Sequence, residues 1–175
     1  MAIGIRVTKG ITDEGGSRFF GAPAIPGEWE KDFGEDVIFF CQIRLSDIAD
    51  LDTEHRLPHS GYLFIFLDTA DFPYQPIVHF FNGEPDTLID GFNDIAEEFA
   101  ALTEGWEMTF SAADDDSEGI RLFGNPNGWE YGEAPPKLLM QFDPLASDMP
   151  FLSEVDGYMF IFETADGYAM QIDRL

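Results

Sequence analysis

Three short sequence blocks occur twice in this chain, in the same order, and this repetition limits the fold more than any other feature. The blocks are Arg-x-Phe-Gly-x-Pro (18–23 and 121–126), an apolar run that ends in Gln (39–42 and 139–141), and Gly-Tyr-x-Phe-Ile-Phe (61–66 and 157–162). Repeated blocks in a fixed order are typical of a fold built from equivalent units. The sequence therefore predicts a single domain, 1–175, made of two repeats at about 18–80 and 121–175, which are joined by a helix-containing acidic insertion at about 81–120.

Each block has a physical role in the predicted fold. Glycine in the Phe-Gly-x-Pro block permits a positive φ and proline fixes the direction of the exit, so the block is expected to form a tight turn. The other two blocks are short and rich in aromatic and β-branched residues, which favours central strands. A glutamine inside an apolar run is expected to bond backbone groups of the adjoining turn, and this role is favoured over ligand recognition. The residues with these structural roles are Gly21, Pro23, Gln42 and Gly61 in the first copy and Gly124, Pro126, Gln141 and Gly157 in the second.

The segment between the copies is predicted to contribute two strands and one helix. The runs at 77–81 and 106–110 have the composition or the alternation of strands. Apolar residues recur at helical spacing with acids on the opposite side, which indicates an amphipathic helix at about 90–103 with Asp90 or Asn93 as its N-cap. The predicted fold class is α+β, mainly β: an internally duplicated antiparallel sheet with one main helix.

The charge of the chain is strongly negative. Nine Lys and Arg against 34 Asp and Glu leave a formal net charge of −25 in a chain that is 45% hydrophobic. So many apolar residues indicate a folded domain rather than an acidic tail, and the shortage of bases excludes a protein that binds the nucleic-acid backbone. No stretch approaches the roughly 18 apolar residues of a membrane span, so a cytoplasmic protein without a membrane partner is expected.

The charge is also unevenly distributed, because the segment 57–120 has no Lys or Arg. Local ion pairs cannot neutralise the acids of this segment, so part of it is expected to face solvent or a basic protein partner. The residues predicted to form this partner face are Glu84, Asp94, Glu97, Glu98, Glu104, Asp114, Asp115, Asp116 and Glu118.

The repeated blocks resemble those of the YwqG-like family of bacterial proteins of unknown function. In the first half the resemblance rests on Phe20 to Pro26, Phe39 to Ile48 and Leu57 to Phe66, and in the second on Leu122 to Pro126, Leu138 to Asp143 and Gly157 to Phe162. It covers nearly everything from Arg18 onward, with Phe20 where the family usually has a first glycine. The resemblance implies a β-rich, internally duplicated fold, and it brings no established activity or catalytic residue.

Motifs for catalysis, cofactors and metals are absent or incomplete in the sequence. It has no Gly-x-Gly-x-x-Gly, Gly-x-Ser-x-Gly, His-Glu-x-x-His or phosphate loop, so no cofactor or metal is expected. Pro58 opposes the helix that a zinc site at His55 and His59 would need. In the acidic turn, Asp114, Asp116 and Glu118 fit positions 1, 3 and 5 of a calcium loop, but Asn125 stands at position 12. A solvated loop is favoured, and calcium binding stays an alternative.

Two further features have alternative interpretations. Arg18 and Arg121 occupy equivalent positions, so either each guanidinium pairs with an acid beside its own turn or both converge on one anionic ligand. Pairing with an acid is favoured, since carboxylates are abundant and no phosphate-binding nest is visible. The single cysteine, Cys41, lies in an apolar run, and a buried inert thiol is favoured over a nucleophile.

Two classes of function follow from these observations. The favoured hypothesis is a non-enzymatic module that presents an acidic surface to a basic partner, for example an immunity or antitoxin-like protein whose carboxylates imitate phosphates. The alternative is a small-ligand-binding protein or hydrolase that uses carboxylates at the ends of the repeated strands, with Asp68, Asp71 and Asp166 as candidates. These three acids have a third, structural interpretation as caps of turns.

Overall fold

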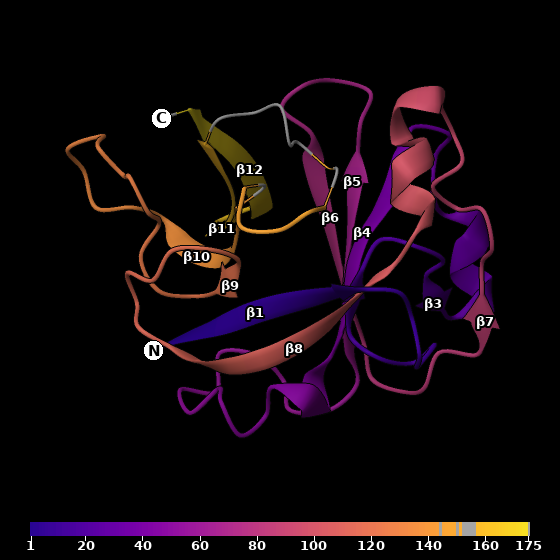
Figure 1. Ribbon diagram of the computed structural model, residues 1–175, viewed down its shortest axis with the longest axis horizontal. Helices are drawn as coiled ribbons and strands as arrows, with labels where there is room; N and C mark the ends of the chain where they lie inside the picture. Colours follow the sequence, from indigo (N-terminus) through magenta and orange to yellow (C-terminus); the bar gives the residue numbers. More distant parts are fainter. Residues whose placement is uncertain (144, 150, 152–156, 175) are drawn as a thin grey trace.

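The computed structural model describes residues 1–143, 145–149, 151 and 157–174 (Figure 1). Within this part, the chain forms twelve strands and three short 3-10 helices. In the first half they are β1 (Ala2–Lys9), β2 (Arg18–Phe19), β3 (Ala24–Ile25), η1 (Gly27–Lys31), β4 (Val37–Arg44), η2 (Leu45–Asp47), β5 (Tyr62–Asp68) and β6 (Gln75–Phe81). They continue as β7 (Thr87–Leu88), η3 (Glu97–Thr103), β8 (Trp106–Ala113), β9 (Arg121–Leu122), β10 (Lys137–Phe142), β11 (Gly157–Thr164) and β12 (Gly167–Arg174).

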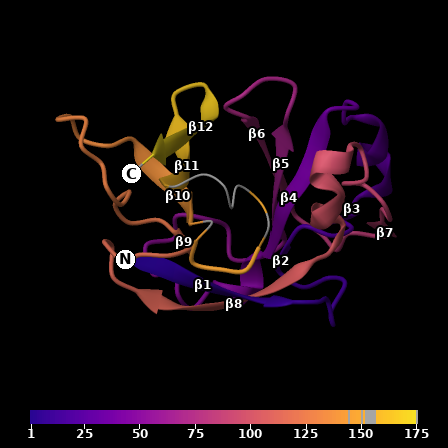
Figure 2. The same ribbon diagram turned by 45° about the horizontal axis from the view of Figure 1, so that its top comes forward.

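Ten of the strands form one antiparallel sheet, in the order β12-β11-β10-β9-β1-β8-β2-β4-β5-β6. The two ends of this order, β6 and β12, lie beside each other, so the sheet nearly closes on itself (Figure 2). Near closure removes most of the exposed strand edges that a ten-stranded open sheet would present. The mainly β, antiparallel character predicted from the sequence is confirmed, and so are strands over the repeated apolar runs.

Two strands at the centre of the sheet are β1 and β8, which pair along their whole lengths. β8 lies in the segment predicted as an insertion between two repeats, yet it pairs with β1 on one side and with β2 on the other. β1 and the C-terminal strand β12 were not among the strands that the sequence predicts. The segment at 81–120 therefore supplies part of the scaffold rather than only an added surface.

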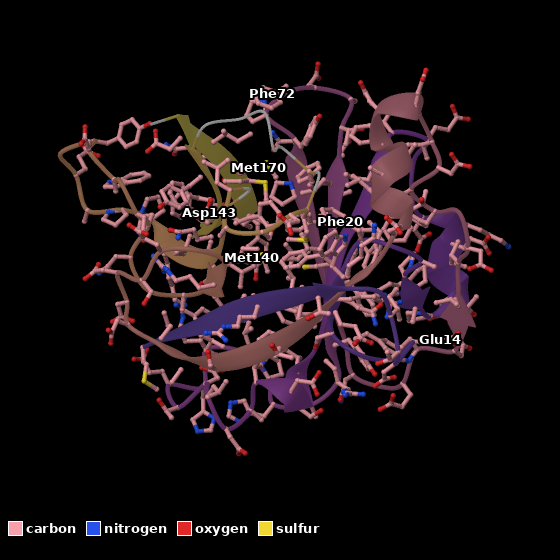
Figure 3. All side chains as sticks on the ribbon, in the orientation of Figure 1. Glu14, Phe20, Phe72, Met140, Asp143 and Met170 are labelled. Carbon is pink, nitrogen blue, oxygen red and sulfur yellow. The ribbon has the colours of Figure 1, made fainter. Side chains whose placement is uncertain are left out.

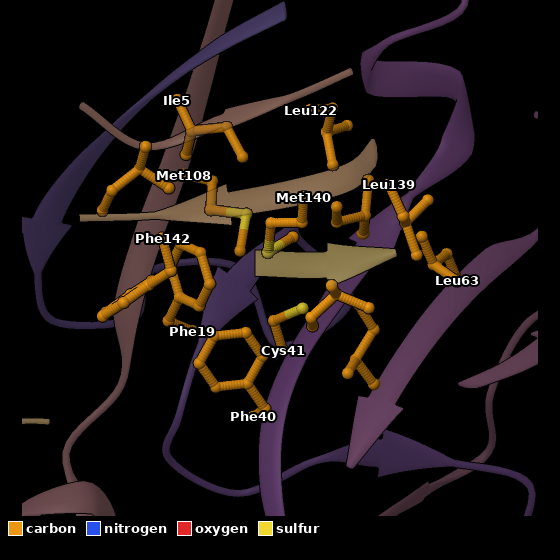
Figure 4. Packing of buried hydrophobic residues seen from close by; sticks show 14 of the residues in the cluster. Ile5, Phe19, Phe40, Cys41, Leu63, Met108, Leu122, Leu139, Met140 and Phe142 are labelled. Carbon is orange, nitrogen blue, oxygen red and sulfur yellow. The ribbon is translucent and has the colours of Figure 1, made fainter. Parts of the chain in front are cut away.

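The main hydrophobic core fills the interior of the sheet (Figure 4). Cys41 lies in this interior among Phe40, Met140 and other apolar side chains, and it is completely buried. Burial raises the pKa of the Cys41 thiol well above its ordinary value, because a thiolate would lose its hydration. The predicted burial of the thiol is confirmed.

A second apolar layer covers the outer face of β4 and β5. Tyr62, Phe64 and Phe66 alternate with interior residues along β5, and they stack in a ladder beneath Trp29. β11 carries a similar outer ladder at Tyr158, Phe160 and Phe162, which packs with Trp129. Both faces of these strands are therefore buried, which explains why their sequences read as continuous apolar runs.

The structure corrects the prediction of a long amphipathic helix between the copies. Turns extend up to Ala96, which is in an extended conformation, and only Glu97–Thr103 is helical, as the 3-10 helix η3. Asn93, a predicted N-cap, is instead buried, and its side chain bonds the backbone of Phe39 and Leu102. Tertiary hydrogen bonds to β4 thus prevail over the helical periodicity of this segment. Within the described residues, no helix is long and apolar enough to cross a membrane.

Candidate functional site

Each Phe-Gly-x-Pro block folds around a buried arginine. We call residues 13–24 the Arg18 turn and residues 114–127 the Arg121 turn. Both arginine side chains are completely buried, although an arginine is rarely enclosed without paired groups around it. The partners of the two guanidinium groups therefore decide what the turns can do.

In the Arg18 turn the guanidinium binds backbone carbonyls. Nη1 of Arg18 donates to the carbonyl oxygens of Glu14 (2.6 Å) and Gly16 (3.4 Å), and Nη2 donates to that of Ala22. Its Nε has no hydrogen-bond partner within the described part of the chain. Burial lowers the pKa of Arg18 to about 10, because the charged guanidinium loses its hydration.

In the Arg121 turn every nitrogen of the guanidinium has an acceptor. Nε of Arg121 donates to the carbonyl of Ser117 (2.7 Å), and Nη1 donates to that of Phe123. Nη2 donates to the carbonyl of Asn125 and to Oδ1 of Asn127 (2.7 Å). Burial lowers the pKa of Arg121 as well. The turn therefore forms a more complete cradle than its counterpart.

The two turns also occupy matching places in the sheet. Arg18 lies opposite Gln42 on one side and Glu107 on the other, and Arg121 lies opposite Gln141 and Gly4. The Phe and Gly that follow each arginine have positive φ angles, at Phe20 (54°) and Gly21 (75°) and at Phe123 (64°) and Gly124 (77°). Positive φ at the glycines confirms the predicted tight turns.

Neither of the two interpretations of the arginines describes the structure. In the described residues, each guanidinium bonds mainly carbonyl oxygens rather than a carboxylate. β1 and β8 lie between the strands that carry Arg18 and Arg121, which at about 4.8 Å per strand separates these strands by about 14 Å. The arginines therefore do not converge on one ligand. Their contacts are structural because each turn folds its own carbonyls inward.

Both glutamines bond the turns as predicted. Oε1 of each accepts from a backbone N–H after the proline block, and Nε2 of each donates to a carbonyl before the arginine. The partners are Ala24 (3.0 Å) and Gly16 (2.9 Å) for Gln42, and Asn127 and Gly119 (both 2.9 Å) for Gln141. The remaining repeat residues support the same frame: Pro23 and Pro126 are buried after the turns, Gly61 precedes β5, and Gly157 begins β11.

The calcium-like turn already holds a cation, because the buried guanidinium of Arg121 bonds its backbone carbonyls. The carbonyl of Ser117 accepts from Arg121, and Oδ1 of Asp116 accepts from Nδ2 of Asn125 (2.9 Å). Among the described residues, no group of three or more His, Cys, Asp or Glu is arranged to hold a metal ion. The bond from Asn125 thus occupies an oxygen of Asp116, one of the three acids that fit the calcium positions.

Two of the histidines lie together and the third lies on a strand. The rings of His55 and His59 stack at 4.4 Å in the link before β5, and Nε2 of His59 is 3.5 Å from the carboxylate of Asp52. His79 lies on β6, where its ring packs against Trp29 at 5.1 Å. Each ring packs against another ring, and all three histidines remain at least partly exposed.

The candidate carboxylates at the strand ends lie on hairpin tips. Asp68 ends β5, and its Oδ1 accepts from the N–H of Ala70 (3.0 Å), which is the geometry of a turn cap. Asp71 and Asp166 are exposed, in the β5–β6 and β11–β12 connections. Figure 2 shows these two hairpins side by side. Exposed tips give the acids no enclosed site, so the structure offers no support for their use as an acid–base pair.

The predicted partner face is divided between the two ends of β8. All nine of its carboxylates are exposed, and Figure 3 shows side chains tipped with oxygen pointing outward around the sheet. Four of them, which we call the end acids, lie in the β8–β9 loop, and four, the η3 acids, lie on or beside η3. The end acids are Asp114, Asp115, Asp116 and Glu118, the η3 acids are Asp94, Glu97, Glu98 and Glu104, and Glu84 lies apart, beside the hydroxyl of Tyr62.

The distance between these groups follows from β8. Eight residues of strand separate them, which at about 3.3 Å per residue is about 25 Å. Within the described residues two members form ion pairs: Asp115 with the amino group of Met1 (3.2 Å) and Glu104 with Lys9 (2.7 Å). The acids therefore make a distributed acidic surface rather than one compact face.

A hollow that the sequence did not predict lies along β1. It has a volume of about 540 Å³, and Arg6, Val7, Trp106, Glu118, Ile120 and Asp148 line it together with smaller residues. We call it the β1 groove. The alternation of Ile3, Ile5 and Val7 with exposed residues is the sequence signal that could have revealed this strand.

Comparison with known proteins finds no family model, no curated protein and no solved structure that matches the chain.

Proposed function

We propose that this protein is a non-enzymatic interaction module that binds a basic protein through its acidic surface. The observation that carries the proposal is the place of the two arginines. Arg18 and Arg121 are enclosed and bonded to carbonyls, so among the described residues two of the nine bases form no ion pair with a surface carboxylate. The surface is thus even more acidic than the composition implies, and such a surface speeds association with basic proteins.

A protein of this kind suits the masking of a basic toxin such as a nuclease. Exposed carboxylates on both ends of β8 can take the positions of phosphates in contact with a basic cleft. An immunity or antitoxin-like role needs no catalytic group in this chain. It also accords with the location of Asp68, Asp71 and Asp166 on hairpin tips rather than in an enclosed site.

We also infer that the chain arose by internal duplication within a YwqG-like architecture. The sequence offset from Arg18 to Arg121 is 103 residues, and the same offset relates Gly4 to Glu107. The pairing of Arg18 with Glu107 and that of Arg121 with Gly4 are therefore images of each other. This agreement supports a repeat unit that begins with β1 and β8, earlier than the sequence blocks alone indicate.

Charge-specific association tests the function. Immobilised protein is exposed to an extract of its native cells at low and at high salt, where the Debye length falls from about 30 Å at 0.01 M to about 3 Å at 1 M. Basic proteins should be retained at low salt and released at high salt. Retention that is insensitive to salt, or retention of no basic protein, would contradict the proposal.

Matched variants show which group of carboxylates binds the partner. Asp114→Asn with Glu118→Gln neutralises two end acids, and Glu97→Gln with Glu98→Gln neutralises two η3 acids, so both pairs change the net charge by the same amount. Binding of a specific partner should weaken more with one pair of substitutions than with the other. Equal weakening would indicate general attraction to a polyanion.

A further inference from the structure

One edge of β1 is open where the sheet loses a neighbouring strand. β9 pairs only with Ile3 and Gly4, and the N–H of Ile5 then donates to the carbonyl of Ile120 (2.8 Å). Beyond that bond, β1 continues to Lys9, while Figure 1 shows β9 ending beside the first part of β1. The β1 groove opens along the remaining edge.

The direction of the free backbone groups follows from the hydrogen-bond alternation. Residues of an antiparallel strand bond the neighbours on its two sides in turn. The backbone N–H of Ile5 points away from β8, so the N–H and C=O groups of Val7 and Lys9 point away from β8 as well. The residue opposite Val7 agrees with this alternation: the N–H of Met108 points away from β1 and donates to Ser17 on the far side of β8. Within the described part of the chain, the N–H and C=O of Val7 have no partner outside the β1 ladders. A half-buried strand edge therefore faces the groove with its bonding groups available.

We propose that the β1 groove binds an extended basic peptide segment, which adds to β1 as a further strand. The inference rests on the proposed function for the charge of the partner, and it names where one segment of that partner binds. Two main-chain groups of Val7 provide the ladder contacts, as in other cases of strand addition. A volume of about 540 Å³ lies within the usual range of about 300–1,000 Å³ for binding pockets.

The side chains of the groove select an alternating segment. Glu118 and Asp148 are exposed on its walls, and they suit Lys or Arg side chains. Val7, Trp106 and Ile120 provide apolar contacts for the residues between. Because successive side chains of a strand point to opposite faces, a segment of alternating basic and apolar residues meets both sets. Arg6 also lines the groove. It repels a basic side chain placed against it, and this repulsion fixes the register of the peptide on β1.

The probe is the peptide acetyl-Lys-Val-Lys-Val-Lys-amide, added to isotopically labelled full-length protein. Binding should shift the NMR signals of the Val7 and Lys9 amides and slow hydrogen exchange at Val7. The amide of Phe110 is an internal control. The offset of 103 residues that relates Gly4 to Glu107 also relates Val7 to Phe110, which lies on β8 and outside the groove. N-methylation of the central peptide residues removes main-chain donors, and it should weaken binding about tenfold or more.

Matched variants separate the groove from general attraction between charges. Glu118→Gln with Asp148→Asn should weaken peptide binding several-fold, while Glu97→Gln with Glu98→Gln on η3 should change it little, although both pairs remove two charges. An acidic peptide, acetyl-Glu-Val-Glu-Val-Glu-amide, should not shift Val7. These results together would support strand addition at β1.

Four outcomes would overturn the inference. Peptide binding that survives N-methylation would exclude a main-chain ladder, and shifts at η3 without shifts at Val7 would place the peptide elsewhere. Exchange protection at Val7 in a concentration-dependent dimer without peptide would assign the edge to a second copy. If the probe leaves Val7 unaffected while basic proteins still bind at low salt, the groove proposal fails and the proposed function stands.

Discussion

The Arg18 and Arg121 turns share a backbone design but differ in how completely they bond their arginine. Nε of Arg121 donates to Ser117, whereas Nε of Arg18 has no partner in the described part of the chain. Asn127 supplies a side-chain acceptor to Arg121, and the corresponding residue in the other turn is Ala24. The comparison shows that the backbone register sets where each arginine lies, while a few side chains set how well its charge is stabilised.

The turns are also covered in different ways by the opposite half of the chain. The guanidinium of Arg56 lies over the ring of Phe123 at 4.0 Å, while Phe20 packs against Phe151 at 5.4 Å. A cation–π contact closes one turn and an aromatic pair closes the other. Each half of the chain thus packs on the turn of the other half. A substitution that disrupts either turn should therefore also destabilise the packing of the opposite half.

The largest effect is expected from removing the better-bonded arginine. Arg121→Met leaves the carbonyls of Ser117, Phe123 and Asn125 without their donor, and it should lower the free energy of unfolding by about 4 kcal/mol. Arg18→Met should cost about 2 kcal/mol, since its Nε makes no bond in the described residues and its charge is the less well stabilised. Urea denaturation of both variants measures the difference.

Lys137→Met is the control for loss of a cation, because Lys137 forms an exposed pair with Glu163 (2.8 Å). It should cost about 0.5 kcal/mol or less. A larger loss for Arg18→Met than for Arg121→Met would refute the view that hydrogen-bond completeness separates the two turns.

The glycines of the two turns should differ in the same direction. A Cβ at Gly124 would lie 2.5 Å from the carbonyl oxygen of Asp115, and one at Gly21 would lie 3.0 Å from the backbone of Gly105. Both positions have positive φ, which costs an alanine about 1–2 kcal/mol before any clash. Gly124→Ala should therefore cost about 3 kcal/mol and Gly21→Ala about 2 kcal/mol, measured by thermal or urea unfolding. Equal losses would mean that the closer contact at Gly124 relaxes freely.

The amide of Asn127 offers a finer test. Asn127→Ala converts the Arg121 turn toward the Arg18 turn, and the loss of a hydrogen bond to a charged group should cost about 1.5 kcal/mol. Asn125→Ala is the matched control, because the side chain of Asn125 is exposed and bonds Asp116 rather than Arg121 within the described residues. If the two alanine variants are equally stable, the amide of Asn127 does not explain the difference between the turns.

Much of the sheet could be predicted from sequence because its strands carry their own signals. The runs of β4, β5, β10 and β11 are apolar on both faces, and the glycines mark the turns. The prediction of a long helix beyond β7 was wrong because Asn93 bonds the distant backbone of Phe39. Helical periodicity does not encode such a tertiary contact. β1 was missed because only half of its residues are apolar and no repeated block includes it.

The site was harder to predict for a related reason. The repeated blocks predict matching positions for Arg18 and Arg121, but the partners of both are carbonyl oxygens, which carry no signature in a sequence. The groove depends on the shortness of β9 and on the neighbouring loop at 146–148. Both are consequences of strand pairing, so they appear only when the chain is folded.

The smallest difference between the turns should appear as a pH dependence. Glu107, opposite Arg18, accepts from Thr12 Oγ1 (2.7 Å) and from the N–H of Asp13 (3.0 Å), and these bonds lower its pKa. A carboxyl whose folded pKa is depressed adds stability above its unfolded value of about 4.5 and loses it as pH falls through the folded value. The gap in unfolding free energy between wild type and Glu107→Gln should thus shrink below pH of about 4. Gly4 lies opposite Arg121 at the same register, so the Arg121 turn has no carboxylate there to give a pH dependence. A gap that does not change with pH would show that the bonds to Glu107 do not depend on its charge.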